Sequence, residues 1–330
     1  MTDTADRLQI DVHLNGEGVL DTLAEDVRKG LTSTPKKLPP KYLYDEIGSQ
    51  LFEDITALPE YYPTRAERAL LERLADDLLQ AHQPAEIVEL GSGSSAKTRV
   101  LLGAPSAPRY LRRYIPFDVS EAIVRETAEE LLRDYPYLNI HGVIGDFEHH
   151  MPLIPDPAGK RLVLFLGGTV GNLDPIPRVE FLHKTAVLLR QEDLLLIGMD
   201  LVKDKQVIEA AYNDSAGVTA AFNRNLLAFL NGALGANFEI AAFRHRAFFN
   251  EEHSRIEMHL IAQTSQRVSI PSLALEVNIA EGESIWTESS YKFTRESISQ
   301  TLEDAGLRMV DFHTNEDPDQ LFGVALAAIG

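Results

Sequence analysis

The stretch IVELGSGSSAKT at residues 87–98 is the part of this sequence best suited to hold a small ligand. It joins an expected strand to an expected helix, so Gly91 and Gly93 can form a tight turn and let a ligand approach the backbone. Three interpretations of the stretch compete, and each implies a different ligand.

Two of these interpretations place a nucleotide phosphate on the loop. As a phosphate-binding loop of the form GxxxxGKT, the stretch has Ala96 where the second glycine is required, and no convincing partner strand ending in Asp follows. As the looser dinucleotide fingerprint GxGxxA, the stretch fits from Gly91 to Ala96. A pyrophosphate, however, would be repelled by Glu89, which stands two residues before Gly91.

The third interpretation is a loop that binds S-adenosylmethionine, which carries a sulfonium and an ammonium group instead of a pyrophosphate. In this interpretation the ligand lies along Gly91, Ser92 and Gly93. Glu89, at the end of the preceding strand, can hold the loop or meet the cationic methionine end of the cofactor.

Acidic residues also end the next two expected strands. Asp118 ends the second strand, where its carboxylate can accept hydrogen bonds from both ribose hydroxyls. Asp146 and Phe147 follow the third strand and suit the amino group and the ring face of adenine. Because three successive strands each deliver an acid at the carboxyl end, the sequence favours the S-adenosylmethionine interpretation, and with it a methyltransferase.

The elements that must position these residues alternate between short apolar strands and amphipathic helices, a pattern typical of a parallel sheet. Strands are expected at 85–90, 113–119, 140–144, 161–168 and 193–201, and a closing helix, strand and strand at 294–306, 306–314 and 321–329. The sequence therefore predicts an α/β fold: a Rossmann-like class I methyltransferase sheet, doubly wound, with an antiparallel edge.

A second lobe is expected because the pattern changes after residue 202. Residues 202–234 are mostly helical in pattern, and strand-like stretches follow at 238–249, 254–264 and 267–279. Residues 32–63 are irregular and rich in proline and aromatic residues, which suits a packed loop or a lid over a pocket. Thr64 begins a capping box with Glu67. We expect a methyltransferase domain at 66–202 and 293–330 and an inserted α+β substrate-binding lobe at 13–65 and 203–292.

Composition restricts the partners of the chain. The 330 residues include 31 Lys and Arg against 50 Asp and Glu, a formal charge of −19, which disfavours nucleic acid and anionic membranes. There is no cysteine, no N-terminal signal pattern and no apolar run near the ~18 residues of a membrane span. We expect a cytoplasmic protein with a small-molecule substrate, no obligatory protein partner and no metal, because His149 and His150 lack metal-ligand spacing and are interpreted as surface residues.

The sequence also resembles the histidine-specific Nα-methyltransferases of ergothioneine biosynthesis, which convert L-histidine to its trimethylated betaine, hercynine. The resemblance runs from about Leu20 to the end of the chain. Its motifs are LPPKYLYDEIGSQLFEDITALPEYYPTR, ELGSGSSAKT, FLGGTVGNL, DLVKD, AAYNDSAGVTAAFNRN and TESSYKF. Several of these motifs lie outside the generic methyltransferase fold, so the match is specific.

The resemblance implies roles for the residues that match its motifs. In the cofactor site it implies Gly91, Lys97, Asp118, Asp146 and Phe147, with Tyr44 and Phe52 closing over S-adenosylmethionine. At the α-amino and α-carboxylate groups of histidine it implies Tyr61, Asn172 and Tyr212, bordered by Gly167 and Thr169. Around the imidazole it implies Glu288 and Ser290 as hydrogen-bond partners, with Met258 packed beside the ring.

Methyl transfer from a sulfonium requires a neutral amine held in line with the methyl group, so positioning supplies much of the acceleration. We expect Asn172 and Tyr61 to orient the amine, and Tyr44, Tyr61 or a water chain to take its proton. Three alternatives stay open at this point: an Nα-methyltransferase for another amino acid, an NAD-dependent oxidoreductase that uses the same glycine loop, and a non-catalytic sensor of histidine or S-adenosylmethionine.

Overall fold

The computed structural model describes residues 7–14, 16–147, 149–315 and 321–330. The chain forms two compact units, unit 1 from Met1–Leu14, Arg65–Leu201 and Phe293–Gly330, and unit 2 from Asn15–Thr64 and Val202–Lys292. Residues 1–6, part of the N-terminal stretch interpreted above as lacking a targeting signal, lie outside the described residues.

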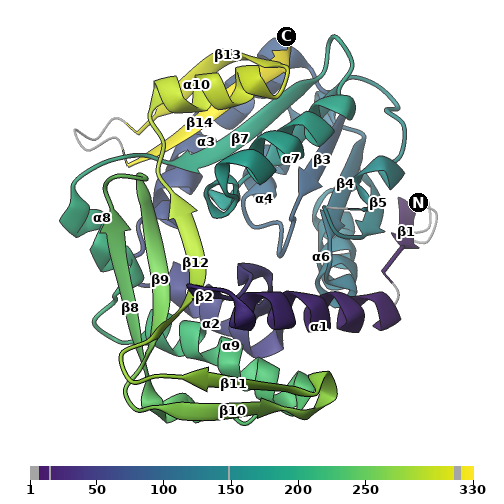
Figure 1. Ribbon diagram of the computed structural model, residues 1–330. Coiled ribbons are helices and arrows are strands. Elements are labelled where there is room, and N and C mark those ends of the chain that lie inside the picture. Colours follow the sequence, from purple (N-terminus) through teal and green to yellow (C-terminus); the bar gives the residue numbers. More distant parts are fainter. Residues whose placement is uncertain (1–6, 15, 148, 316–320) are drawn as a thin grey trace. The chain divides into compact units, whose positions relative to one another are not determined.

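Unit 1 is built on an eight-stranded sheet with the strand order β1-β5-β4-β3-β6-β7-β14-β13 (Figure 1). Its strands are β1 (Leu8–Val12), β3 (Glu86–Leu90), β4 (Arg113–Asp118), β5 (Asn139–Ile144), β6 (Arg161–Phe165), β7 (Leu194–Asp200), β13 (Leu307–Thr314) and β14 (Phe322–Ile329). Neighbouring strands run parallel except β14, which is antiparallel to both β7 and β13. The predicted class I methyltransferase sheet with an antiparallel edge is confirmed, and β1 is an additional strand that the sequence analysis does not predict.

The strand order reverses between β3 and β6, and the crevice at the carboxyl ends of such strands is where ligands bind in open α/β sheets. Every residue of β3 and of β6 is buried, as expected for central strands covered on both faces. In Figure 1, α7 and α10 lie in front of the sheet and α3 lies behind it. The helices of this unit are α3 (Pro63–His82), α4 (Thr98–Leu102), α5 (Ala107–Tyr110), α6 (Glu121–Asp134), α7 (Pro175–Val187) and α10 (Arg295–Asp304).

A buried ion cluster joins the amino ends of three of these strands. Glu86 is 1% exposed and accepts hydrogen bonds from Arg161 Nε at 2.6 Å and from the Arg113 guanidinium. Arg161 is 2% exposed, and its backbone N–H donates to Asp193 at 2.7 Å. Because a buried charge left without its partner costs about 3–5 kcal/mol, this cluster holds β3, β4 and β6 in alignment.

Unit 2 combines a four-stranded sheet, a hairpin and helices. The sheet has the order β2-β12-β9-β8, with β2 (Lys36–Lys37), β12 (Ser284–Tyr291), β9 (Arg255–Ala262) and β8 (Phe243–Asn250). The hairpin pairs β10 (Gln266–Ile270) with β11 (Leu275–Ile279). The helices are α1 (Gly16–Thr32), α2 (Glu46–Thr56), α8 (Lys205–Tyr212) and α9 (Val218–Leu234).

Two expectations for this unit are corrected. The segment 32–63, expected to be irregular, contains α2, because Asp45 caps its first turn by accepting a hydrogen bond from the Gly48 N–H at 2.8 Å and no proline interrupts it. The stretch 267–279, expected to be one strand, folds back on itself, because Pro271 ends β10 and Ala274 adopts a left-handed φ of 47°.

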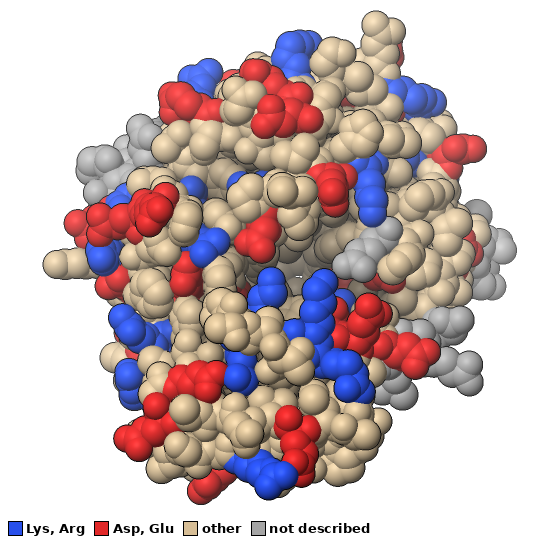
Figure 2. All heavy atoms as spheres, viewed as in Figure 1, with Lys and Arg blue, Asp and Glu red and all other residues tan. Residues whose placement is uncertain are grey.

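Among the described residues, no helix has both the length and the hydropathy needed to cross a membrane. Figure 2 shows acidic and basic side chains interspersed on the face that it displays.

Candidate active site

The glycine loop between β3 and α4 folds over the end of β4. Gly91 and Gly93 have φ values of 72° and 47°, which favour glycine. The Gly91 N–H donates to the Phe117 carbonyl at 2.8 Å, and the Gly93 N–H donates to Asp118 Oδ2 at 2.9 Å. A Cβ atom on Gly93 would meet no atom within 4 Å, so the loop is open at this point.

Asp118 is held in place by backbone groups. Its Oδ1 accepts a hydrogen bond from the Ser120 N–H at 3.0 Å, while Oδ2 accepts the one from Gly93. A carboxylate oxygen can accept two hydrogen bonds, and each oxygen of Asp118 accepts one from the backbone. The fixed carboxylate therefore keeps acceptor capacity for ligand hydroxyls.

Glu89 lies in a buried network below the loop. It is 4% exposed and accepts a hydrogen bond from the Tyr114 hydroxyl, which in turn lies 2.7 Å from Ser95 Oγ in the loop. Burial raises the pKa of Glu89 to about 7, and the hydrogen bond from Tyr114 opposes that rise. Of the two roles suggested from sequence for Glu89, these contacts support the holding of the loop.

Asp146 follows β5 and is flanked by two histidines. It accepts a hydrogen bond from the His149 N–H at 2.7 Å, and His150 Nδ1 lies 3.0 Å from its Oδ2. Burial raises the pKa of Asp146, but the hydrogen bonds from His149 and the charges of both imidazoles outweigh it, so the pKa is lowered. The interpretation of both histidines as surface residues is wrong for His150, whose side chain is only 19% exposed and stacks on His13 at 6.2 Å between centroids.

Phe147 borders the glycine loop. Its ring stacks on Phe117 with centroids 5.8 Å apart and meets Phe165 and Phe181 edge-on. A Cβ atom on Gly91 would lie 3.4 Å from the Phe147 ring, so the loop and the ring are in van der Waals reach of each other. The structure therefore brings together the predicted residues at the ends of β3, β4 and β5.

Glu67 is a residue of this site that the sequence analysis assigns to a different role. It is fully buried, and its carboxylate accepts hydrogen bonds from the Gly167 N–H at 2.8 and 3.0 Å. Lys97 Nζ lies 2.6 Å from the same carboxylate. The predicted capping box with Thr64 is therefore wrong: α3 begins at Pro63, and Glu67 turns inward to join Lys97 to the loop after β6.

The loop after β6 carries three of the predicted substrate residues. Gly167 and Gly168 have φ values of 87° and 68°, which lead into a 3-10 helix, η4 (Thr169–Asn172). The Thr169 hydroxyl donates to the Leu166 carbonyl at 3.1 Å. Asn172 ends the turn and is partly exposed.

In unit 2, the predicted imidazole-binding residues lie on neighbouring strands. Glu288 on β12 is directly opposite Met258 on β9, so their side chains share one face of the sheet. Ser290 lies two residues further along β12, on the same face as Glu288. The register shifts between Trp286 and Glu288, a bulge that changes the direction of the following side chains.

Glu288 is a buried carboxylate without a hydrogen-bond partner among the described residues. It is 7% exposed, and burial raises its pKa to about 7 although the charge of Lys292 opposes the rise. A buried acceptor of this kind is costly unless a ligand supplies the donor.

Aromatic side chains form a continuous cluster in the same unit. Tyr44 packs edge-on against Phe52 and Phe222, with centroids 5.4 Å apart in both pairs, and Phe52 packs against Tyr61 at 6.2 Å. Tyr61 packs in turn against Tyr212 at 6.2 Å. Desolvation at the hydroxyl, followed by the charge of nearby Glu288, raises the pKa of Tyr44 and keeps its phenol protonated, although 40% of the residue is exposed. No role is predicted for Phe222 from the sequence.

Lys292 is a further residue whose role is not predicted from the sequence. It is 4% exposed, and its Nζ donates to the Tyr212 hydroxyl at 3.0 Å and to Ser290 Oγ at 2.9 Å. The only signal in the sequence is its place in the motif TESSYKF, two residues beyond Ser290.

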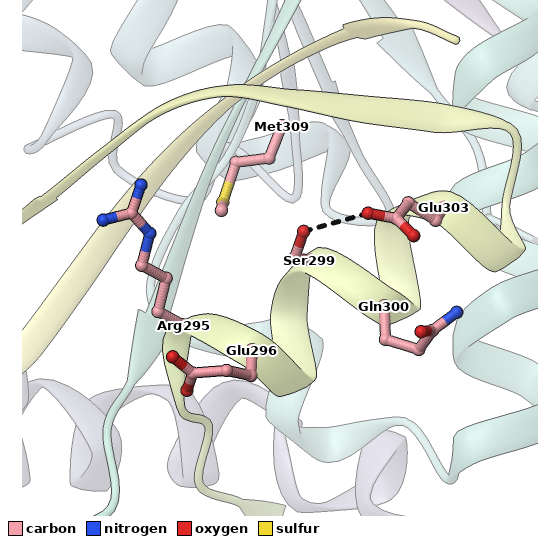
Figure 3. Close-up of a pocket in the computed structure, with 6 residues that line it drawn as sticks. All are labelled: Arg295, Glu296, Ser299, Gln300, Glu303 and Met309. Atoms are coloured by element: carbon pink, nitrogen blue, oxygen red, sulfur yellow. Dashed lines mark hydrogen bonds between the residues drawn. The ribbon is translucent and has the colours of Figure 1, made fainter.

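A separate surface pocket of about 410 Å³ lies between α10 and β13 (Figure 3). The residues that line it are Arg295, Glu296, Ser299, Gln300, Glu303 and Met309, and none of them is a predicted site residue. Ser299 donates a hydrogen bond to Glu303 at 3.2 Å across the pocket lining. The lining carries charges of both signs, from Arg295 and from Glu296 and Glu303.

Comparison with known proteins identifies the family. The model of the histidine-specific, S-adenosylmethionine-dependent methyltransferases matches residues 23–329. The chain belongs to this family. It is 48% identical over 315 residues to the histidine N-alpha-methyltransferase of Mycolicibacterium smegmatis, covering 96% of this chain and 97% of that protein. It is 46% identical over 322 residues to the same enzyme of Mycobacterium tuberculosis, covering 98% and 99%.

A more distant relative is ergothioneine biosynthesis protein 1 of Schizosaccharomyces pombe, 28% identical over 285 residues, covering 83% of this chain and 37% of that protein. Membership of the family establishes that the chain is a methyltransferase and that its cofactor is S-adenosylmethionine, as the glycine loop and the three strand-end acids predict. The phosphate-loop and dinucleotide interpretations of that loop are thereby excluded.

Proposed function

We propose that this protein methylates the α-amino group of L-histidine with S-adenosylmethionine, three times, to give hercynine in ergothioneine biosynthesis. The names of two similar relatives, both histidine N-alpha-methyltransferases, and of the more distant ergothioneine biosynthesis protein 1 support this substrate and pathway. Unit 1 is the cofactor-binding domain in this proposal, and unit 2 binds the amino acid.

The observation that carries the choice of histidine is the buried, unpartnered carboxylate of Glu288. Met258 and Ser290 share its face of the sheet, so an apolar surface, an acceptor and a hydroxyl lie together. An imidazole ring offers an N–H to the carboxylate and a flat apolar face to the thioether. A site that hydrogen-bonds a polar ring in this way discriminates by about 10⁴-fold against side chains that lack the partner.

The residues of unit 1 fit the cofactor. The open space above Gly93 gives room close to the backbone, and Ser92 Oγ is buried without a hydrogen-bond partner in the described part of the chain. Asp118 would hold the ribose hydroxyls, while Asp146 and Phe147 would hold the adenine. Lys97, paired to Glu67, would stand beside the methionine end.

S-adenosylmethionine supplies an electrophilic methyl group, which leaves its sulfur as a new bond to the amine nitrogen forms. The protein must present that nitrogen with a free lone pair. In this proposal Asn172 and Tyr61 orient the amine, and Tyr212 holds the carboxylate end. Since the pKa of Tyr44 is raised, its phenol serves as a hydrogen-bond donor, and the amine proton leaves through Tyr61 or water.

The proposal is tested with methyl-labelled S-adenosylmethionine and L-histidine, comparing the wild-type protein with Glu288→Gln. We expect label in histidine, and kcat/KM lowered about ten- to hundredfold by the substitution, since a hydrogen bond to a charged group contributes about 1.5–3 kcal/mol. Glu257→Gln is the matched control, because Glu257 is equally buried on the neighbouring strand but is paired with Arg255. Equal activity of Glu288→Gln and the wild type would contradict the proposal.

A further inference from the structure

Lys292, Tyr212 and Ser290 form a closed triangle of hydrogen bonds. Lys292 Nζ donates to the Tyr212 hydroxyl at 3.0 Å and to Ser290 Oγ at 2.9 Å. The Tyr212 hydroxyl donates to Ser290 Oγ at 2.9 Å, which closes the triangle. The Lys292 ammonium also lies 4.8 Å from the centre of the Tyr212 ring. All three residues are buried.

The protons in this triangle can be counted. An ammonium group only donates, so both hydroxyls must direct their own protons away from Lys292. Tyr212 directs its proton to Ser290. Ser290 Oγ then accepts two hydrogen bonds, which uses both lone pairs of a serine hydroxyl. The group that Ser290 has left for a ligand is its O–H, so Ser290 acts as a donor.

Glu288 presents the opposite character on the same face of β12. Its carboxylate accepts hydrogen bonds and has no partner among the described residues. The two side chains therefore offer a ligand one acceptor, on Glu288, and one donor, on Ser290. A neutral imidazole has one N–H and one unprotonated nitrogen, whereas an imidazolium has two N–H groups and no acceptor.

We propose that Lys292 is a positioning residue that makes this site select the neutral form of the imidazole ring, with the ring N–H facing Glu288 and the unprotonated nitrogen facing Ser290. This inference rests on the proposed function, because it concerns the charge state of histidine in that site. Lys292 acts through Tyr212 and Ser290, whose hydrogen-bond directions it fixes.

The charges around the ring support the same choice. Among the described residues, the ionisable groups around this face of unit 2 include Glu288, Lys292, Tyr44, Tyr61 and Tyr212, and His245 contacts the Tyr212 carbonyl at 2.9 Å. An imidazolium would add a second positive charge beside the buried Lys292 ammonium, and a neutral ring would not.

The charge state of the bound ring can be measured directly. Histidine labelled with nitrogen-15 in the ring is bound to the protein with S-adenosylhomocysteine at about pH 6, below the usual imidazole pKa of about 6.5. Nitrogen-15 chemical shifts distinguish an N–H from an unprotonated nitrogen. We expect one of each in the wild-type complex, and two N–H signals would overturn the inference.

Lys292→Met tests the role of the lysine. Without the ammonium, Ser290 regains a lone pair and no buried positive charge opposes a charged ring, so we expect the bound ring to become an imidazolium at about pH 6. At about pH 8 we expect histidine to bind about tenfold more weakly, equivalent to about 1.4 kcal/mol. A neutral ring and unchanged affinity in Lys292→Met would overturn the inference.

Lys203→Met is the matched control, since Lys203 also donates to a tyrosine hydroxyl, that of Tyr62, at 2.8 Å and lies 4.5 Å from that ring. We expect it to bind the neutral ring with wild-type affinity. If Lys292→Met does not fold, as judged by binding of S-adenosylhomocysteine, Tyr212→Phe removes one of the two donors to Ser290 and is expected to weaken the selection of the neutral ring in the same way. A wild-type signature in Tyr212→Phe would overturn the proton count.

The same wild-type sample is assayed for methylation of histidine. If histidine is methylated but binds as an imidazolium, the inference fails and the proposed function stands. If histidine neither binds nor is methylated, both fail.

Discussion

Replacing Glu288 by glutamine is expected to remove a pH dependence from the stability of the ligand-free protein. Burial raises the pKa of Glu288 from 4.5 to about 7 in the folded chain. Between these two values the folded chain keeps a proton that the unfolded chain has lost. The stability that this proton contributes is therefore fully present below pH about 4.5 and is lost as the pH rises from there through about 7.

The size of the effect follows from the two pKa values. A difference of about 2.5 units, at about 1.4 kcal/mol for each unit, gives about 3 kcal/mol in the free energy of unfolding. Glutamine is nearly the same size and does not titrate. The Glu288→Gln protein is therefore expected to lose about 3 kcal/mol less than the wild type between pH about 4.5 and about 8.

Urea unfolding followed by circular dichroism at several pH values measures this slope. Glu257→Gln is the control with the opposite sign, because the hydrogen bonds from Arg255 outweigh burial and lower the pKa of Glu257. That control is expected to be less stable at neutral pH and to keep the wild-type slope across this window. If Glu288→Gln also keeps the wild-type slope, the folded chain does not hold the extra proton. The claim that burial raises the pKa of Glu288 would then be wrong.

Three further substitutions have expected outcomes. Glu86→Gln leaves Arg161 buried without its ion pair, so urea unfolding should show a loss of about 3–5 kcal/mol. Gly91→Ala places a Cβ on a left-handed φ, which should cost about 1–2 kcal/mol and weaken S-adenosylhomocysteine binding measured by calorimetry. Glu67→Gln removes the ion pair with Lys97 and loosens the loop after β6, so kcat/KM should fall about ten- to hundredfold, and an unchanged value would contradict the role given to Glu67.

The sheet of unit 1 could be predicted because its central strands are apolar on both faces. Every residue of β3 and β6 is buried, and such runs stand out between helices of regular periodicity. β1 could not be predicted, because it lies at the edge of the sheet and its side chains are only partly buried. An edge strand needs no strong apolar pattern to pair with its neighbour.

Residues whose roles depend on distant partners escaped the sequence analysis. Glu67 matches a capping box in sequence, but its carboxylate instead accepts a hydrogen bond from the N–H of Gly167, which is 100 residues away. Lys292 belongs to no spacing pattern that predicts a role. Its role depends on its hydrogen bond to Tyr212, which is 80 residues away. Local spacing cannot report contacts of this kind, because they exist only after the strands and helices have packed.

The segment 32–63 shows a different limit. Its prolines suggest irregular structure, yet α2 fits between them because Asp45 supplies an N-terminal cap. The aromatic residues of this segment do pack together, as Tyr44, Phe52 and Tyr61 show, but the partner Phe222 comes from α9. The roles of these residues toward cofactor and substrate stay predictions.

Mass spectrometry of the reaction products tests the central claim most directly. The purified protein and S-adenosylmethionine are incubated with one amino acid per reaction, L-histidine in one and each of the other proteinogenic amino acids in the rest. We predict that histidine gains three methyl groups on its α-nitrogen and that no other amino acid is modified. Methylation of a different amino acid, with histidine left unchanged, would contradict the imidazole site at Glu288, Ser290 and Met258.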